Sequence, residues 1–256
     1  MTEDFMELFA GPRLKIERAK EHINDLQRRI SAFEQSDVYS TVIQNDPNTG
    51  NNILYIVMAD ALPDEFALII GDALHNLKAA LDLLVNEVVY TRLGLYDDFT
   101  RFPVRDTREK LVIATNGGLV REASKAVTDF IVNTVKPYRG GNDAFWALHR
   151  LNILDKHRLL LPVFKVTALN GIRVKFEGDE TFDFGTWVIT GSRAVFHEFQ
   201  GKRNVKITDS GKPTLLILFD KGLPMEGRPV IESLHQLTEV VSETVEGIEN
   251  VFLSER

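Results

Sequence analysis

A long apolar stripe between residues 63 and 93 constrains the fold more than any other feature of the sequence. Its apolar members recur at spacings of three and four: Phe66, Ile69, Ile70, Ala73, Leu74, Leu77, Ala80, Leu81, Leu84, Val85, Val88 and Val89. This spacing is typical of one wide face of an α-helix. Pro63-Asp64-Glu65 suits the first turn of a helix, and Gly94 suits its end. We therefore predict a heavily buried helix over residues 63–93, against which other helices must pack.

The remaining elements are predicted from the same periodicities. Amphipathic patterns predict further helices over residues 12–33, 120–135, 144–157 and 229–252. Two β-rich runs, Val38–Ile43 and Ile53–Met58, flank a loop of turn-forming residues, which predicts an antiparallel hairpin. After Pro162, short β-rich runs alternate with turns and predict strands over residues 163–169, 172–176, 187–190, 205–208 and 215–219.

These elements predict an α+β fold: a helical bundle with an N-terminal β-hairpin, followed by a mostly antiparallel sheet and a closing C-terminal helix. We expect residues 1–160 to form the helical bundle region with the hairpin, and residues 161–256 to form the sheet with the C-terminal helix. No linker rich in Pro, Gly or Ser divides the two parts. We therefore expect them to pack as one compact unit.

Composition and charge exclude several classes of function. The 256 residues include no cysteine, which excludes thiol catalysis and zinc–thiolate sites. The 30 basic and 37 acidic side chains give a net charge of −7, which argues against non-specific binding to double-stranded DNA. The N-terminus Met1–Phe5 is acidic, unlike a secretory signal, and no apolar run approaches the roughly 18 residues of a membrane span. We expect a soluble, cytoplasmic protein with no membrane partner and no cofactor.

Ionisable side chains gather in two predicted helical segments, residues 71–82 and 149–158. A buried ionic network that joins the two helices would account for them. Its members would be Asp72, His75 and Asp82 in the first segment and Arg150, Lys156 and Arg158 in the second. Such a network would be structural, and the protein would then have a binding or interaction role.

A metal site would also account for these side chains. Asp72 and His75 lie three residues apart on one predicted helix, and Asp155 and His157 lie near the end of another. Two neighbouring helices can present carboxylates and imidazoles to one ion. A metal-dependent hydrolase that uses Asp72, His75 and His157 is therefore one hypothesis.

Arg150 and His157 carry a third hypothesis. Seven positions apart, they would lie on one face of a continuous helix. This spacing resembles the Arg-x(4–6)-His motif of the HEPN superfamily, helical bundles of which many members are metal-independent ribonucleases. The resemblance implies a homodimer acting on RNA, in which Arg150 holds the phosphate and His157 transfers a proton. Asn152 supplies a polar group near the arginine, so the candidate catalytic residues are Arg150, His157 and Asn152.

Both segments also resemble a group of uncharacterised bacterial proteins of similar size. The shared patterns are Gly71-Asp72-x-x-His75-Asn76-Leu77-Lys78-x-Ala80-Leu81-Asp82 and Asp155-Lys156-His157-Arg158. The resemblance implies a bacterial origin and does not point to a particular activity.

Overall fold

The computed structural model describes residues 8–36, 39–58, 62–160, 162–176, 181–183, 185–187, 193–200 and 205–255. They form the predicted α+β fold, with an N-terminal hairpin, antiparallel sheets and a closing helix. The chain divides into two compact units. The helical unit comprises Met1–Leu26, Asp64–Leu161 and Phe219–Arg256, and the strand unit comprises Gln27–Pro63 and Pro162–Leu218.

The boundaries of these units differ from the predicted division at residue 160. The predicted hairpin belongs to the strand unit, because its second strand pairs with β7 (Arg193–Phe199) from the other half of the chain. The C-terminal helix α7 (Val230–Ser254) was predicted to group with the sheet. It belongs to the helical unit, because its apolar face packs against α2 (Glu65–Leu93). Order along the chain was a poor guide because both pairings join distant segments.

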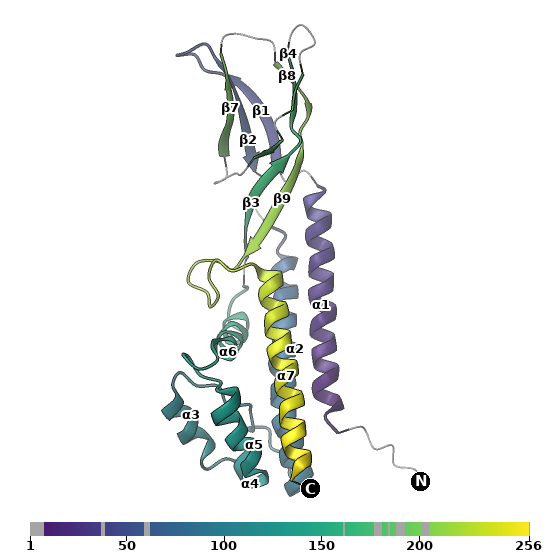
Figure 1. Ribbon diagram of the computed structural model, residues 1–256, viewed down its shortest axis with the longest axis vertical. Coiled ribbons are helices and arrows are strands. Elements are labelled where there is room, and N and C mark those ends of the chain that lie inside the picture. Colours follow the sequence, from purple (N-terminus) through teal and green to yellow (C-terminus); the bar gives the residue numbers. More distant parts are fainter. Residues whose placement is uncertain are drawn as a thin grey trace, which may run out of the picture. The chain divides into compact units, whose positions relative to one another are not determined.

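Helix α2 is the helix predicted from the apolar stripe, and it packs against α4, α6 and α7 (Figure 1). It ends at Gly94, whose φ of 66° lies in the left-handed region and whose N–H donates to the Tyr90 carbonyl at 2.8 Å. The remaining helices are α1 (Ala10–Glu34), α3 (Arg108–Thr115), α4 (Leu119–Ala123), α5 (Lys125–Phe130), the π-helix η1 (Ile131–Val135) and α6 (Asp143–Asp155).

These helices differ from the prediction in three ways. Helix α3 was not predicted, since the sequence analysis placed no helix or strand between the helices over residues 63–93 and 120–135. The helix predicted over residues 120–135 is divided at Ser124, whose Oγ accepts the N–H of Val127 at 3.0 Å and so caps α5. The helix predicted over residues 144–157 ends at Asp155 instead of His157.

The start of α1 is fixed to both α2 and α7. Phe9 is fully buried, and its ring meets that of Phe252 edge-on with 6.0 Å between the ring centroids. The Phe9 N–H donates to Glu87 Oε2 at 2.6 Å. Arg13 forms an ion pair with Glu249. These contacts make the first turn of α1 part of the core of the helical unit.

The described strands form three three-stranded antiparallel sheets, with strand orders β1-β2-β7, β6-β3-β9 and β5-β4-β8. The strands are β1 (Tyr39–Asn45), β2 (Asn52–Met58), β3 (Val163–Asn170), β4 (Arg173–Phe176), β5 (Thr181–Asp183), β6 (Thr186–Trp187), β7 (Arg193–Phe199), β8 (Val205–Asp209) and β9 (Lys212–Leu218). The hairpin β1–β2 is therefore confirmed, whereas β5 and β7 were not predicted. Residues 188–190 of one predicted strand lie outside the described residues.

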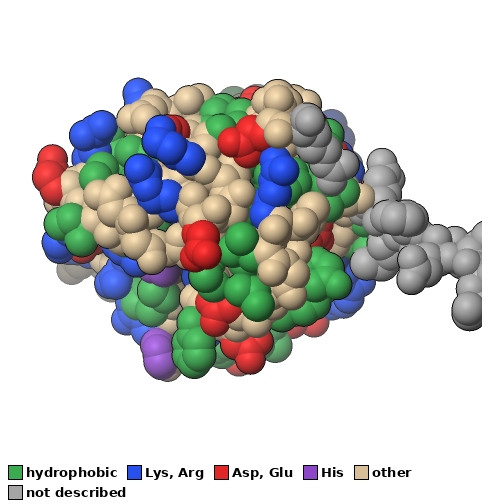
Figure 2. Space-filling model, turned by 90° about the horizontal axis from the view of Figure 1, so that it is seen from below, with side chains coloured by type: hydrophobic (Ala, Val, Ile, Leu, Met, Phe, Trp, Pro, Cys, Tyr) green, Lys and Arg blue, Asp and Glu red, His purple; other side chains and the backbone are tan. Residues whose placement is uncertain are grey.

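One end of the helical unit is mixed in charge. Figure 2 shows basic and acidic side chains interspersed with apolar ones at the end that holds α3, α4 and α5. This face therefore presents no uniform charge, and the charge bias described below lies within a cavity.

Among the helices that the structure describes, none is both long enough and apolar enough to cross a membrane.

Phe9→Ala should lower the free energy of unfolding by about 3–5 kcal/mol, because it removes a fully buried aromatic side chain and leaves a cavity. Leu14→Ala is the matched control, since Leu14 lies on α1 and is 69% exposed. We expect it to change stability by less than about 0.5 kcal/mol. Denaturant unfolding followed by circular dichroism measures both, and equal losses would contradict the packing of Phe9.

Candidate functional site

The structure brings parts of the two ionisable segments together where α2 meets α6. The Asp155 carboxylate lies against the backbone of Gly71, so closely that a Cβ on Gly71 would lie 2.6 Å from Asp155 Cγ. Burial and the nearby Asp72 carboxylate raise the pKa of Asp155, while His75 acts in the opposite direction. His75 Nδ1 lies 3.4 Å from Asn152 Oδ1. The two sequence patterns, residues 71–82 and 155–158, therefore both contribute residues to the polar contact between α2 and α6.

The contacts of Asp82 differ from the predicted ionic network. Its carboxylate pairs with Lys78, one turn earlier on α2, and also accepts the N–H of Phe102 at 2.9 Å. Arg150 is exposed and lines a small cavity of about 240 Å³ together with Asp106. These two partners of Asp82 thus come from its own helix and from the segment that follows it.

Asp72, His75 and His157 do not assemble into a metal site. Among the residues that the structure describes, no group of three or more His, Asp or Glu side chains is placed to hold a metal ion. The helix end explains part of this arrangement, because α6 stops at Asp155 and His157 lies in the following turn. His157 is exposed in that turn, which the helical prediction did not anticipate.

The candidate ribonuclease residues occupy different environments. Arg150 lies within α6 and is exposed, and His157 is exposed in the turn beyond the helix. Asn152 is buried. Arg150 and His157 therefore do not share one continuous helical face as the spacing predicted. The ribonuclease activity, the RNA partner and the homodimer stay predictions.

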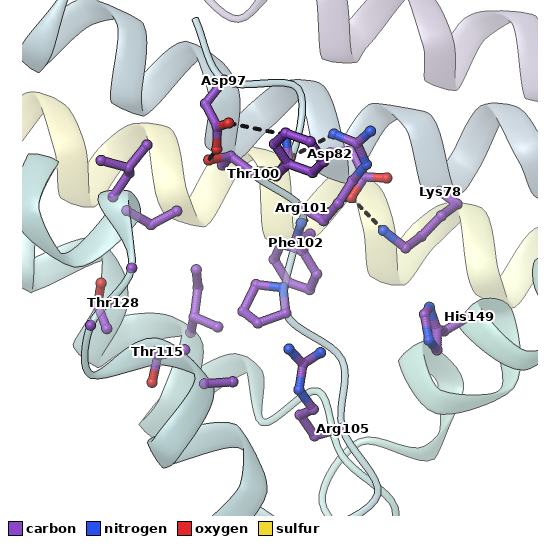
Figure 3. A pocket seen from close by; sticks show the side chains of 18 of the residues that line it. Lys78, Asp82, Asp97, Thr100, Arg101, Phe102, Arg105, Thr115, Thr128 and His149 are labelled. Carbon is purple, nitrogen blue, oxygen red and sulfur yellow. Dashed lines mark hydrogen bonds and ion pairs between the residues drawn. The ribbon is translucent and has the colours of Figure 1, made fainter. Parts of the chain in front are cut away.

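A cavity of about 690 Å³ lies in the helical unit among α2, α6, η1 and the segment 97–105 (Figure 3). We call it the main cavity. Its charged lining consists of Lys78, Asp82, Asp97, Arg101, Arg105 and Lys156. Its apolar lining includes Phe99, Phe102, Pro103, Leu119, Val120, Ile131 and Ile153. The cavity thus combines apolar walls with a small number of charged groups.

The charged lining of the main cavity is positive. It holds four basic and two acidic side chains, in a chain whose net charge is −7. His149 also lines this cavity, and burial, followed by the charges of Lys78 and Arg105, lowers its pKa. These surroundings therefore favour the neutral imidazole over the charged one. Its Nδ1 is buried and, among the described residues, is the single buried side-chain nitrogen or oxygen with no hydrogen-bond partner.

Lys78 is the most unusual member of this lining, because its side chain is only 7% exposed. Burial lowers its pKa, and the paired Asp82 carboxylate opposes that shift. Two more cations, Arg101 and Lys156, lower the pKa further. A buried ammonium group of this kind is unfavourable unless it is paired or hydrogen-bonded.

The segment 97–105, which lines the cavity, is held by hydrogen bonds within itself and to α2. The Thr100 hydroxyl donates to Asp97 at 2.7 Å within the segment, and Asn86 Nδ2 of α2 donates to the Thr100 carbonyl at 2.9 Å. The N–H of Phe102 binds Asp82. Phe99, between these anchors, is 90% exposed at the edge of the cavity. The positions of Arg101 and Phe102 therefore depend on polar side chains of α2.

A second cavity of about 460 Å³, which we call the side cavity, adjoins the first. His75 and Lys15 line it. The residues common to both cavities are Lys78, Asp82, Asp97, Arg101, Asn152 and Lys156. The two ionisable segments predicted from the sequence thus meet at the boundary between the cavities.

Sequence reasoning missed the arginines of this site. Arg101 and Arg105 flank Phe102-Pro103 in a segment for which no helix, strand or site was predicted. The available signal was the pair of cations placed within four residues of each other, directly after the long buried helix. Lys78 and Lys156 lay inside the quoted patterns, but their burial and their common cavity follow from the tertiary packing.

Comparison of the chain with protein-family models, with curated proteins and with solved structures gives no match.

Gly71→Ala tests the contact between α2 and α6. Alanine is favoured over glycine within a helix by about 1 kcal/mol, but in the wild-type background its Cβ must displace the Asp155 carboxylate. We expect the substitution to be more favourable by about 1 kcal/mol in an Asp155→Ala background, as measured by a double-mutant cycle of unfolding free energies. Identical effects in both backgrounds would show that the contact has no energetic weight.

Asp155→Asn should stabilise the protein at pH 7. The pKa of Asp155 is raised in the folded state, so ionisation destabilises the fold, and the penalty is present above the folded pKa. As the pH falls through the folded pKa, the wild-type carboxyl is protonated and the penalty is lost. The difference in melting temperature between variant and wild type should therefore shrink in acid. A difference that grows in acid would contradict the raised pKa.

Proposed function

We propose that the protein binds an amphipathic organic anion in the main cavity. The observation that carries this proposal is Lys78, an almost completely buried cation on the wall of a cavity whose other charged groups are mainly basic. The proposal gives a ligand class to the binding role expected from the sequence. A metal ion is not part of it.

The shape and lining of the cavity support a small organic ligand. Its volume of about 690 Å³ falls within the range of roughly 300–1,000 Å³ typical of small-molecule sites. Such sites are mostly apolar, with a few polar groups that fix the orientation of the ligand. Here Phe102 and Ile153 supply apolar walls, and Lys78, Arg101 and Arg105 supply polar groups.

Charge selects an anion over a neutral molecule. Opposite charges attract more strongly near the low-dielectric interior of a protein than in water. Arg101 and Arg105 each direct one Nη1–H to a backbone carbonyl, at 2.9 Å to Thr100 and 2.8 Å to Val104. A guanidinium group has five N–H donors, so these bonds use a fraction of its capacity. Both arginines can therefore bind a carboxylate, sulfonate or phosphate group.

Two fluorescent probes with the same aromatic rings, one charged and one neutral, distinguish recognition of charge from binding to apolar surfaces. 8-Anilinonaphthalene-1-sulfonate carries an anionic group, and N-phenyl-1-naphthylamine has the same rings without it. In fluorescence titrations we expect saturable binding of the sulfonate and weaker binding of the neutral amine. Added salt should weaken the binding of the sulfonate alone. Equal affinities for the two probes would contradict the proposal and would indicate adsorption to exposed apolar side chains such as Phe99.

A pair of charge reversals locates the binding. Lys156→Glu changes an exposed cation that lines both cavities, and Arg158→Glu changes an exposed cation two residues further on that lines neither described cavity. We expect Lys156→Glu to weaken binding of the sulfonate about tenfold, or about 1.4 kcal/mol, with little effect on the neutral amine. Arg158→Glu should behave as wild type. Equal losses in both variants would point to a general effect of net charge.

A further inference from the structure

We propose that Lys78 reacts with ligands held in the main cavity, by condensing with the carbonyl group of a 2-oxo acid or an anionic aldehyde to form an imine. This inference rests on the proposed function, because the anion-binding groups hold the carbonyl compound beside the amine. It adds a covalent activity to the binding role.

The position of Lys78 supports this reaction. Its side chain lies on the part of the wall that is common to the main and side cavities, and it is only 7% exposed. A molecule must therefore enter a cavity to reach the amine. Figure 3 shows Lys78 on α2 with its amine directed to Asp82, and His149 on the neighbouring helix.

The charged groups around Lys78 favour the neutral, nucleophilic amine. They come from every side of the lysine: Asp82 on its own helix, Arg101 on the following segment, His149 on α6 and Lys156 just beyond α6. Burial and the two cations lower the pKa of Lys78, whereas Asp82 opposes this shift. At pH 7 a larger fraction of Lys78 is therefore neutral than of an exposed lysine, which is the condition for imine formation.

Asp82 is placed to carry the protons of the reaction. Its carboxylate accepts a proton from the Lys78 ammonium, and the neutral amine attacks the carbonyl carbon. A C–N bond forms as the C=O π bond breaks, and a proton passes from the attacking nitrogen to the carbonyl oxygen, which becomes the hydroxyl of a carbinolamine. Asp82 then returns its proton to that hydroxyl, which leaves as water, and the nitrogen lone pair completes the iminium. The overall reaction consumes one amine and one carbonyl and releases one water, without an oxidant or reductant.

The remaining cations account for the ligand class. Arg101 and Lys156 line the same two cavities as Lys78. A carboxylate bound to either cation holds an adjacent carbonyl group near the amine and converts the attack into an intramolecular step. A 2-oxo acid has this arrangement, with its carbonyl next to its carboxylate.

Reductive trapping with glyoxylate and sodium cyanoborohydride tests the proposal on the wild-type protein. Glyoxylate is an anionic aldehyde, and the reductant converts its imine to a stable carboxymethyl-lysine. Peptide mapping by mass spectrometry over a time course at pH 7 should show Lys78 labelled faster than the exposed Lys110 and Lys125, because its lowered pKa leaves more of its amine neutral. 8-Anilinonaphthalene-1-sulfonate should slow labelling of Lys78 and leave labelling of Lys110 unchanged.

Lys78→Arg separates the reaction from binding. Arginine keeps the positive charge but does not condense under these conditions, so the variant should still bind the sulfonate probe and should lose the fast-labelled site. Lys125→Arg is the matched control and should keep the fast-labelled site, because Lys125 is exposed and lines neither the main nor the side cavity. If wild-type Lys78 is labelled no faster than exposed lysines while the sulfonate still binds, the imine inference is overturned and the proposed function stands. If the wild-type protein neither binds the sulfonate nor shows fast labelling of Lys78, both the proposed function and the imine inference are overturned. The peptide map of the wild type tests the imine inference even if Lys78→Arg does not fold.

Discussion

Burial of α2 on most of its surface is the constraint from which the rest of the helical unit follows. Helices α4, α6 and α7 pack around it, and its buried residues include Lys78 and Asn76 as well as its apolar stripe. A polar side chain on such a helix has little access to water, so it requires a partner from the protein. Lys78 pairs with Asp82 on the next turn, and Asp82 also holds the N–H of Phe102. The cavity therefore lies where α2 carries Lys78 and Asp82.

The apolar stripe made the long helix predictable, because spacings of three and four sustained over the whole segment fit a helix and do not fit a strand. The hairpin was predictable for a similar reason, since turn formers separated two β-rich runs. Helix α3 and the π-helix η1 were not, because neither follows from a local pattern. The assignment of the hairpin and of α7 to units also required tertiary pairing with β7 and α2. Local sequence thus specified elements better than it specified their partners.

The candidate site was likewise predictable only where local sequence specified it. The sequence singled out the segments that contain His75, Lys78, Asp82 and Lys156, because ionisable residues stand out within apolar helices. His75, Asp82 and Lys156 were assigned to an ionic network and His75 also to a metal site, while Lys78 was given no role, since spacing on a helix does not show which side chains share a cavity. The two arginines of the segment 97–105 were not recognised, because their role depends on how Asn86 and Asp82 hold that segment. Contacts of this kind arise only in the folded chain.

Asp82 contributes both to the stability of the site and to its proposed chemistry. The carboxylate binds both the Lys78 ammonium and the backbone of Phe102, so removing it would leave a buried cation and an unpaired N–H at once. A loss of activity on substitution of Asp82 would therefore not distinguish proton transfer from a displaced loop. Lys78 is the more informative position, because arginine can retain its charge and its pairing with Asp82 while changing the reactivity of the nitrogen. The contrast between charge and nucleophilicity at this one residue separates a binding cavity from a reactive one.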